Sequence, residues 1–226
     1  MRKITSLMFA LIFGLSFLAN AQDVQKDQPK GYQFTDIKRL PATSVKDQAR
    51  AGTCWSWSGI SFFESEMIRM GKEPIDLSAM YIVRHAYSDK ATKFVRLHGS
   101  MNFAVGGAFC DVMHVIKNYG IVPMDVYMGL NYGEPNHAFG EIDDVLAGYI
   151  NAVIKNSNKK LSTAWKKGFD GILDAYLGEE PEKFEYKGKE YTPRTFADEV
   201  VGLNMDDYVS LTSFTHHPFY SQFAIE

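Results

Sequence analysis

The chain has 226 residues, a formal net charge of −3 and only two cysteines, Cys54 and Cys110. The slight acidity and the lack of basic runs give no electrostatic basis for binding nucleic acid or an anionic membrane surface. Two cysteines are too few for a disulfide scaffold, so the fold must be stabilised by other interactions.

Residues 1–21 have the pattern of a secretory signal peptide. Arg2 and Lys3 precede an apolar stretch at 4–18, which is too short to span a bilayer comfortably, and Ala19-Asn20-Ala21 supplies the small residues of a cleavage site. No cysteine follows that site, so we expect no lipid or other membrane anchor. We therefore predict an exported protein, periplasmic or secreted, whose mature chain begins at Gln22 and has a net charge of −5.

After a polar lead-in at 22–30 and an extended segment at 32–45, the run Gln48 to Trp55 is typical of a thiol nucleophile at the start of a helix. From Cys54 to Met70 apolar residues recur at helical spacing, and Gly71 supplies a left-handed stop. The predicted buried stripe consists of Ile60, Phe63, Met67 and Met70, and Glu64, Glu66 and Arg69 are expected to lie off it.

A thiol in this position has a physical reason to be reactive. The first turn of a helix has unpaired N–H groups and the positive end of the helix dipole, and both stabilise a thiolate at Cys54. The side-chain amide of Gln48 is placed to join the Cys54 backbone N–H in holding an oxyanion. The alternatives are a buried, inert cysteine or a Cys54–Cys110 disulfide, while Cys110 itself is expected to pack as a small hydrophobe on a helix.

The next elements are mostly helical. Asp76 or Ser78 is expected to cap a helix that carries Met80, Tyr81, Val83 and His85. Gly106-Gly107 precedes a second periodic run, which Gly120 closes; its apolar residues are Phe109, Val112, Val115, Ile116 and Tyr119. A helical insertion is predicted at about 141–178, with a break near 156–160.

The last elements are shorter. Residues 184–191 alternate around a Lys-Gly pair and predict a β-hairpin. Thr192-Pro193 predicts the start of a helix that runs through Val201 and ends at Gly202. Glu141-Ile142-Asp143-Asp144 is expected to be an acidic helix start rather than a pair of catalytic carboxylates.

Three separated segments resemble the papain-like cysteine peptidases, specifically the bleomycin hydrolase or aminopeptidase C branch. They are Gln48 to Trp55, Gly106-Gly107, and the stretch from Leu177-Gly178-Glu179-Glu180-Pro181 through 202–209. The first is close to the general signature Cys-Gly-[Ser/Ala]-Cys-[Trp/Tyr], with Thr53 in the Ser/Ala position. The last is similar to a segment that marks this branch and not papain itself.

The resemblance implies an α+β, papain-like fold in which a helical subdomain with a central nucleophile helix is present and the β-rich subdomain is largely missing. It implies Cys54 as the nucleophile and Gln48 as the oxyanion glutamine. Gly107 would pair its backbone with the substrate, and Gly106 would let that backbone approach closely. Peptide substrates would be cleaved through an acyl-enzyme, with no metal or organic cofactor, in a homo-oligomer that is a hexamer in the resembled branch.

The chain also departs from this pattern. Ala51 and Ala104 stand at two positions that a disulfide joins in secreted papain relatives. No Asn-Ser-Trp segment precedes Glu226, so we expect the catalytic His and Asn beyond residue 226 and His216 and His217 in an ordinary loop or strand. The remaining histidines have no metal-ligand spacing; they are His85, His98, His114 and His137.

The expected identity is therefore the N-terminal portion, 22–226, of an exported cysteine aminopeptidase that is inactive as the chain is given. The resemblance attributes the preference for free N-termini to a C-terminal tail that blocks the cleft and is absent here. One alternative is a non-catalytic, papain-like binding or assembly subunit. Another is a bare fragment that does not fold stably.

Overall fold

The structure is a computed structural model, and it describes residues 31, 32, 34–211 and 213–223. Two units are distinguished, divided between Arg39 and Leu40, and each is described by itself. The described part of the first unit has no regular secondary structure. The predicted signal peptide and the predicted mature end at Gln22 lie outside the described residues.

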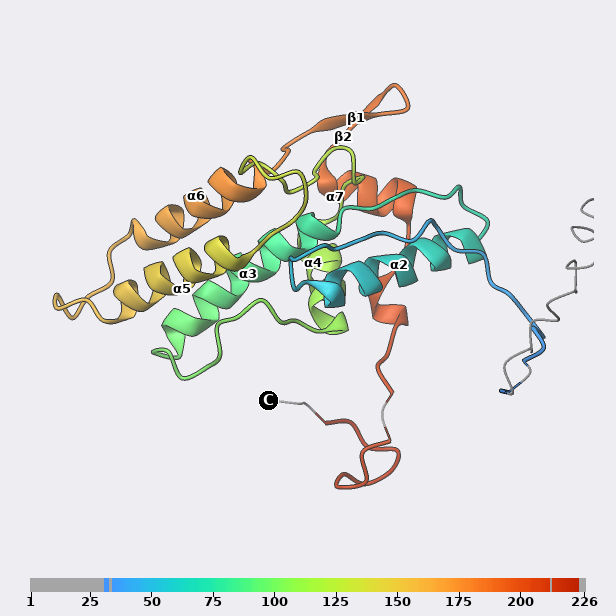
Figure 1. Cartoon of the computed structure of the whole chain (residues 1–226), viewed down its shortest axis with the longest axis horizontal. Coiled ribbons are helices and arrows are strands. Elements are labelled where there is room, and N and C mark those ends of the chain that lie inside the picture. Colours follow the sequence, from blue (N-terminus) through green and yellow to red (C-terminus); the bar gives the residue numbers. More distant parts are fainter. Residues whose placement is uncertain (1–30, 33, 212, 224–226) are drawn as a thin grey trace, which may run out of the picture. The chain divides into compact units, whose positions relative to one another are not determined.

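The second unit is a helical assembly with one small hairpin (Figure 1). Its α-helices are α2 (Cys54–Arg69), α3 (Ala79–Arg96), α4 (Phe109–Tyr119), α5 (Gly140–Ile154), α6 (Trp165–Leu177) and α7 (Pro193–Phe196). Its strands are β1 (Phe184–Tyr186) and β2 (Lys189–Tyr191), and a π-helical turn (Ala197–Val201) and a 3₁₀ turn (Met205–Asp207) follow α7. Each predicted helix and the predicted hairpin is present.

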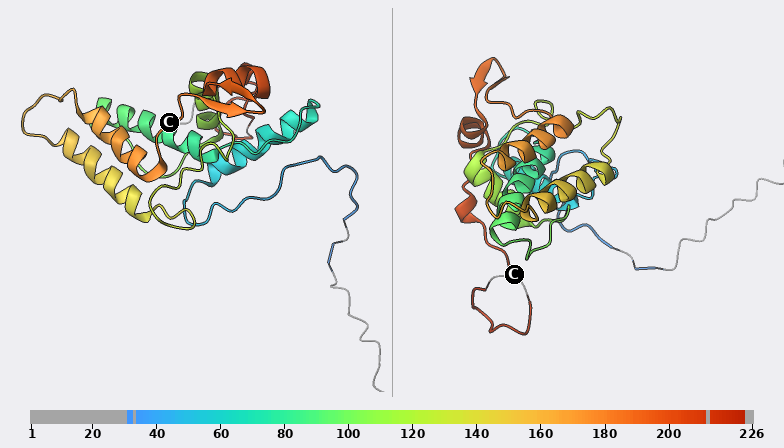
Figure 2. Two further views of the ribbon diagram at one scale, coloured as in Figure 1. Left: turned by 90° about the horizontal axis from the view of Figure 1, so that it is seen from above. Right: turned by 90° about the vertical axis from the view of Figure 1, so that its left-hand side faces the viewer.

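Helix α3 is the centre of this unit and contacts α2, α4, α5 and α6. Every residue in its first nine positions is buried, as expected for a helix that is covered on several sides. Ser78 caps α3, because its hydroxyl accepts a hydrogen bond from the Tyr81 N–H at 3.0 Å. Figure 2 shows α5 and α6 side by side along α3, so the predicted insertion forms a helical pair against the central helix.

The hairpin supplies the only sheet among the described residues. Phe184 pairs with Tyr191 and Tyr186 pairs with Lys189 in antiparallel register. Lys187 and Gly188 both have positive φ, 50° and 77°, the combination that a type I′ turn requires. This helix-rich unit with one two-stranded sheet agrees with the expected helical subdomain.

Helix α2 corrects two details of the predicted stripe. Glu64 is 1% exposed instead of lying off the stripe. It accepts hydrogen bonds from the Leu77 N–H at 2.8 Å and from the Thr43 hydroxyl, and it forms a 2.8 Å ion pair with Lys46. Burial opposes the charge of Lys46, but hydrogen bonds to Asp76 and Glu64 outweigh it and raise the pKa of this lysine.

The other detail is Met70, which is 51% exposed. The helix ends one residue earlier, at Arg69, so Met70 no longer follows the helical period. The predicted stop is confirmed, since Gly71 has φ 79° and Lys72 N–H bonds to the Met67 carbonyl at 2.9 Å.

The segment after the hairpin closes the far end of α4. The Arg194 guanidinium donates to the carbonyls of Ile116 and Lys117 at 2.7 and 2.8 Å, which satisfies the end of that helix. A Cβ on Gly120 would meet the Pro193 carbonyl oxygen at 2.3 Å, so only glycine allows this approach. The predicted helix from Pro193 continues as a π-helical turn after Phe196 and ends at Gly202, as predicted.

Candidate active site

Cys54 is the first residue of α2, a helix of 16 residues, and its side chain is an exposed free thiol. The preceding Thr53 is fully buried, and its hydroxyl accepts a hydrogen bond from the Trp57 indole at 3.1 Å. The first turn of α2 contains no acidic residue. The thiol therefore lies at the positive end of a helix with no nearby carboxylate on its own turn to oppose a thiolate.

The residues before Cys54 form a tight turn. The Ala51 N–H donates to the Gln48 carbonyl at 3.2 Å, and Ala49 and Gly52 both have positive φ. The side-chain oxygen of Gln48 is buried and has no hydrogen-bond partner among the described residues. Buried polar groups are normally paired, so leaving this amide oxygen unpaired costs stability, and no contact within the fold offsets that cost.

A second segment holds this turn in place. Arg50 donates its N–H to the His137 carbonyl at 2.9 Å and accepts the Phe139 N–H at 3.2 Å, which makes a short parallel bridge between Arg50 and Ala138. Ala51 is fully buried at this point. The chain just before α5 therefore fixes the segment that leads to the nucleophile.

Trp55 joins the nucleophile helix to the glycine loop. Its indole N–H donates to the Val105 carbonyl at 3.0 Å. A Cβ on Gly107 would lie 2.5 Å from the Trp55 ring, whereas a Cβ on Gly106 would meet nothing within 4 Å. The close approach of this loop to Trp55 thus requires glycine at 107, whereas position 106 faces open space, and the role of Gly106 toward a substrate stays a prediction.

Cys110 also differs from its prediction. It lies on α4, as expected, but it is exposed and free, because the buried face of that helix carries Val112, Val115 and Ile116 instead. Its helical turn contains Asp111, whose carboxylate accepts the Ala108 N–H at 2.8 Å. Both thiols therefore lie in first helical turns, and only that of Cys110 has an adjacent carboxylate.

None of the described histidines forms a hydrogen bond with Cys54. His85 is buried between tyrosine rings, with Nε2 2.9 Å from the Glu180 carboxylate, which also forms an ion pair with Arg84 at 3.2 Å. Glu180 belongs to one of the segments that carry the resemblance, so an ion pair between a half-buried carboxylate and the buried Arg84 joins that segment to α3. The pKa of Glu180 is lowered: burial opposes the shift, but the hydrogen bond from His85 and the nearby cations outweigh it.

The backbone of His137 binds the segment that leads to Cys54, because its carbonyl accepts the Arg50 N–H. Its ring is 8% exposed and packs edge-on against Trp57 and Phe139. Burial lowers its pKa, so the ring is neutral at neutral pH. His216 and His217 lie in a loop at 213–223, where their rings contact each other and Phe223.

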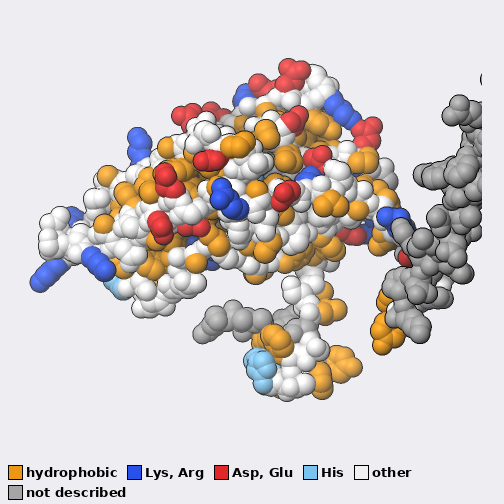
Figure 3. All heavy atoms as spheres, viewed as in Figure 1, with side chains coloured by type: hydrophobic (Ala, Val, Ile, Leu, Met, Phe, Trp, Pro, Cys, Tyr) orange, Lys and Arg blue, Asp and Glu red, His pale blue; other side chains and the backbone are white. Residues whose placement is uncertain are grey.

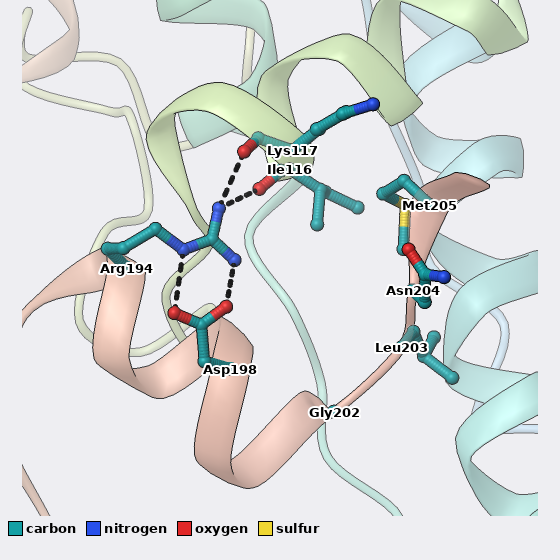
Figure 4. A pocket seen from close by; sticks show the side chains of 8 residues that line it. All are labelled: Ile116, Lys117, Arg194, Asp198, Gly202, Leu203, Asn204 and Met205. Atoms are coloured by element: carbon teal, nitrogen blue, oxygen red, sulfur yellow. Dashed lines mark hydrogen bonds and ion pairs between the residues drawn. The ribbon is translucent and has the colours of Figure 1, made fainter.

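Several cavities lie outside this arrangement. The one in Figure 4 has a volume of about 500 Å³, and Arg194 and Asp198 line it as a charge pair with two hydrogen bonds. None of its lining residues belongs to the Cys54 turn or the glycine loop. Within the described part of the chain, no group of three or more His, Cys, Asp or Glu side chains could hold a metal ion.

Other features of the described residues concern membranes and charge. None of the helices among them has both the length and the apolar content needed to cross a bilayer. On the face drawn in Figure 3, acidic and basic side chains are interspersed and form no continuous basic surface.

No protein-family profile matches the chain. Curated sequences do match it. Aminopeptidase C of Lactococcus lactis subsp. lactis strain IL1403 is 24% identical over 213 residues, which cover 78% of this chain and 47% of that protein. Aminopeptidase C of Streptococcus thermophilus is 23% identical over 215 residues and is covered to the same 47%.

A solved structure also matches the chain. The crystal structure of PepW from Lactobacillus rhamnosis HN001 superposes with a TM-score of 0.52 and 22% identity, over 74% of this chain and 46% of that one. The match shows a shared fold, and the chain spans about half the length of the relatives it matches. These matches support the resemblance to the aminopeptidase C branch of the papain-like cysteine peptidases, over about half the length of those proteins.

Proposed function

We propose that the chain carries the nucleophile and the oxyanion side of an exported cysteine aminopeptidase. The observation that supports this most directly is the exposed, free Cys54 thiol at the first residue of α2, beside a glycine loop that Trp55 holds against the same helix. Export is supported by the signal-like residues 1–21.

The proposed reaction begins when the Cys54 thiolate forms a bond to the carbonyl carbon of a peptide. The carbonyl oxygen becomes an oxyanion, which the Cys54 N–H and the Gln48 amide hold. The carbon–nitrogen bond then breaks, and the amine leaves with a proton. Water hydrolyses the remaining thioester, which releases a carboxylate and restores the thiol.

The leaving amine needs a proton donor, commonly an imidazole. Because no described histidine forms a hydrogen bond with Cys54, we propose that this donor lies outside the described residues. The 226-residue chain should then react with electrophiles whose leaving group needs no proton, while it fails to turn over peptide amides.

A dipeptidyl chloromethyl ketone tests this proposal, since chloride leaves without protonation. We expect covalent labelling at Cys54, detected by intact mass and peptide mapping, and an unchanged rate in Cys110→Ser. Labelling should be lost in Cys54→Ser. Equal labelling of Cys54 and Cys110 would remove the case for an activated Cys54, because the adjacent Asp111 should make Cys110 the slower thiol.

A second candidate is a non-catalytic subunit that binds peptides at the same site. The lack of a hydrogen bond between Cys54 and any described histidine favours it. Release of the fluorophore from aminoacyl fluorogenic substrates by protein purified from the native host separates the two. Turnover that Cys54→Ser abolishes supports the peptidase, whereas tight peptide binding without turnover supports the binding subunit.

A further inference from the structure

Lys90, on α3, lies beside the glycine loop without an acidic partner. Its ammonium donates to the Gly106 carbonyl and to the Ala104 carbonyl, the latter at 3.2 Å. The described residues offer it no ion pair. Burial lowers its pKa, against the opposing fields of Asp111 and Asp143. A partly buried lysine therefore donates its hydrogen bonds to two backbone carbonyls of one loop.

Trp55 completes this arrangement. The Lys90 ammonium lies 5.6 Å from the centroid of the Trp55 ring, within the range of a cation–π contact. The indole N–H in turn binds the Val105 carbonyl. Three consecutive carbonyls of this loop are thus hydrogen-bonded. Lys90 binds those of residues 104 and 106, and Trp55, which directly follows Cys54, binds that of residue 105.

These contacts determine the direction of one N–H group. The Gly106 carbonyl and the Gly107 N–H belong to one peptide unit, which is planar and trans, so the two groups point in opposite directions. That carbonyl is bound to Lys90, and the Gly107 N–H donates to no acceptor among the described residues. The N–H is left available on an exposed residue.

We propose that Lys90 is a positioning residue that fixes the peptide plane between Gly106 and Gly107 and thereby aims the Gly107 N–H at the backbone of a bound peptide. The inference rests on the proposed function and on the pairing of Gly107 with substrate that the resemblance implies. Lys90 also supplies a non-covalent restraint on a loop whose Ala104 stands at a disulfide position of the secreted papain relatives.

The test compares two electrophiles at Cys54 in a Cys110→Ser background. Iodoacetamide reports the thiol alone, whereas a dipeptidyl chloromethyl ketone also needs the backbone pairing. The variants are Lys90→Met, which keeps the unbranched stem without the charge, and Lys90→Arg, which keeps charged donors. Lys93→Met, on the next turn of α3 and exposed, is the matched control.

We expect the ratio of the peptidyl rate to the iodoacetamide rate to fall about tenfold in Lys90→Met, the upper end of the loss for one hydrogen bond. The iodoacetamide rate should stay within about twofold, since that reagent makes no backbone pairing. Lys90→Arg should recover at least half of the ratio, and Lys93→Met should leave it unchanged. If Lys90→Met does not fold by circular dichroism, Lys90→Gln replaces it with the same expectation.

Two results would overturn the inference, and only one of them would also refute the pairing of substrate with Gly107. A strong peptidyl preference in the wild type that Lys90→Met retains would show that Lys90 does not position the loop, while the proposed function stands. A wild type that shows no peptidyl preference would refute substrate pairing at Gly107, and the role of Lys90 would fall with the proposed function.

Discussion

Replacing Gly107 by alanine should destabilise the protein, whereas the same change at the neighbouring Gly106 should have little effect. A Cβ on Gly107 would lie 2.5, 2.6 and 2.8 Å from three atoms of the Trp55 ring, and a Cβ on Gly106 would meet nothing within 4 Å. Neither glycine has a positive φ, so the comparison isolates the steric contact from backbone strain.

The expected loss of unfolding free energy follows from how far the new Cβ displaces the Trp55 ring. An ordinary carbon contact is about 3.5–4.0 Å, so the ring has to move by roughly 1 Å. The ring is 9% exposed and its N–H binds the Val105 carbonyl at 3.0 Å, so it has little room to move. Overpacking costs about 1–3 kcal/mol, and the strained hydrogen bond adds about 1 kcal/mol. We expect a loss of about 2–4 kcal/mol for Gly107→Ala.

Urea unfolding followed by tryptophan fluorescence measures this loss. With a denaturant dependence of about 2–3 kcal/mol per molar, the midpoint should fall by about 1 M in Gly107→Ala. Gly106→Ala should stay within about 0.5 kcal/mol of the wild type. Equal midpoints for the two variants would refute the packing of Gly107 on Trp55 and, with it, the described attachment of the loop to the nucleophile helix.

Three further predictions concern other parts of the chain. Glu64→Gln should lose about 2–4 kcal/mol, because it leaves Lys46 without its buried carboxylate, whereas Glu66→Gln, at a half-buried glutamate paired with the exposed Arg69, should lose at most about 1 kcal/mol; similar losses in urea unfolding would contradict this. Because burial lowers the pKa of His137, the unfolded chain takes up a proton first as the pH falls below about 6.5, so stability should decrease there and His137→Phe should reduce that decrease; identical pH profiles would show that this ring does not matter. Intact mass of the protein from its native host should give an N-terminus at Gln22, and retention of Met1 would argue against export.

The elements that the sequence predicts well are those with local signals. The start of α2 at Cys54 and its stop at Gly71, and the hairpin turn at Lys187-Gly188, each depend on residues a few positions apart. The same holds for the cap at Ser78, although Asp76 was an equal candidate before the Tyr81 N–H contact was known. Periodicity and capping therefore sufficed to find the elements and the segment that carries the thiol.

The errors arise where partners are distant along the chain. Glu64 is buried because Lys46 and Thr43 reach it from 18 and 21 residues away, and no local pattern reveals that compensation. Lys90 likewise finds its carbonyls 14 and 16 residues away, so nothing in its own helix indicates a role. Cys110 is exposed because the face of α4 that is buried depends on which helices it meets.

The attachment of α4 to a segment much later in the chain has a consequence for biosynthesis. Arg194, which closes the end of α4, lies 77 residues after Lys117, and Val200, whose carbonyl binds the Lys72 ammonium, comes later still. At about 5–20 residues per second, a ribosome needs roughly 4–15 s to cover the interval between Lys117 and Arg194. During that time the last carbonyls of α4 and the Gly120 turn await their partners, so this end of the helix is where a chaperone would find incomplete structure on the nascent chain.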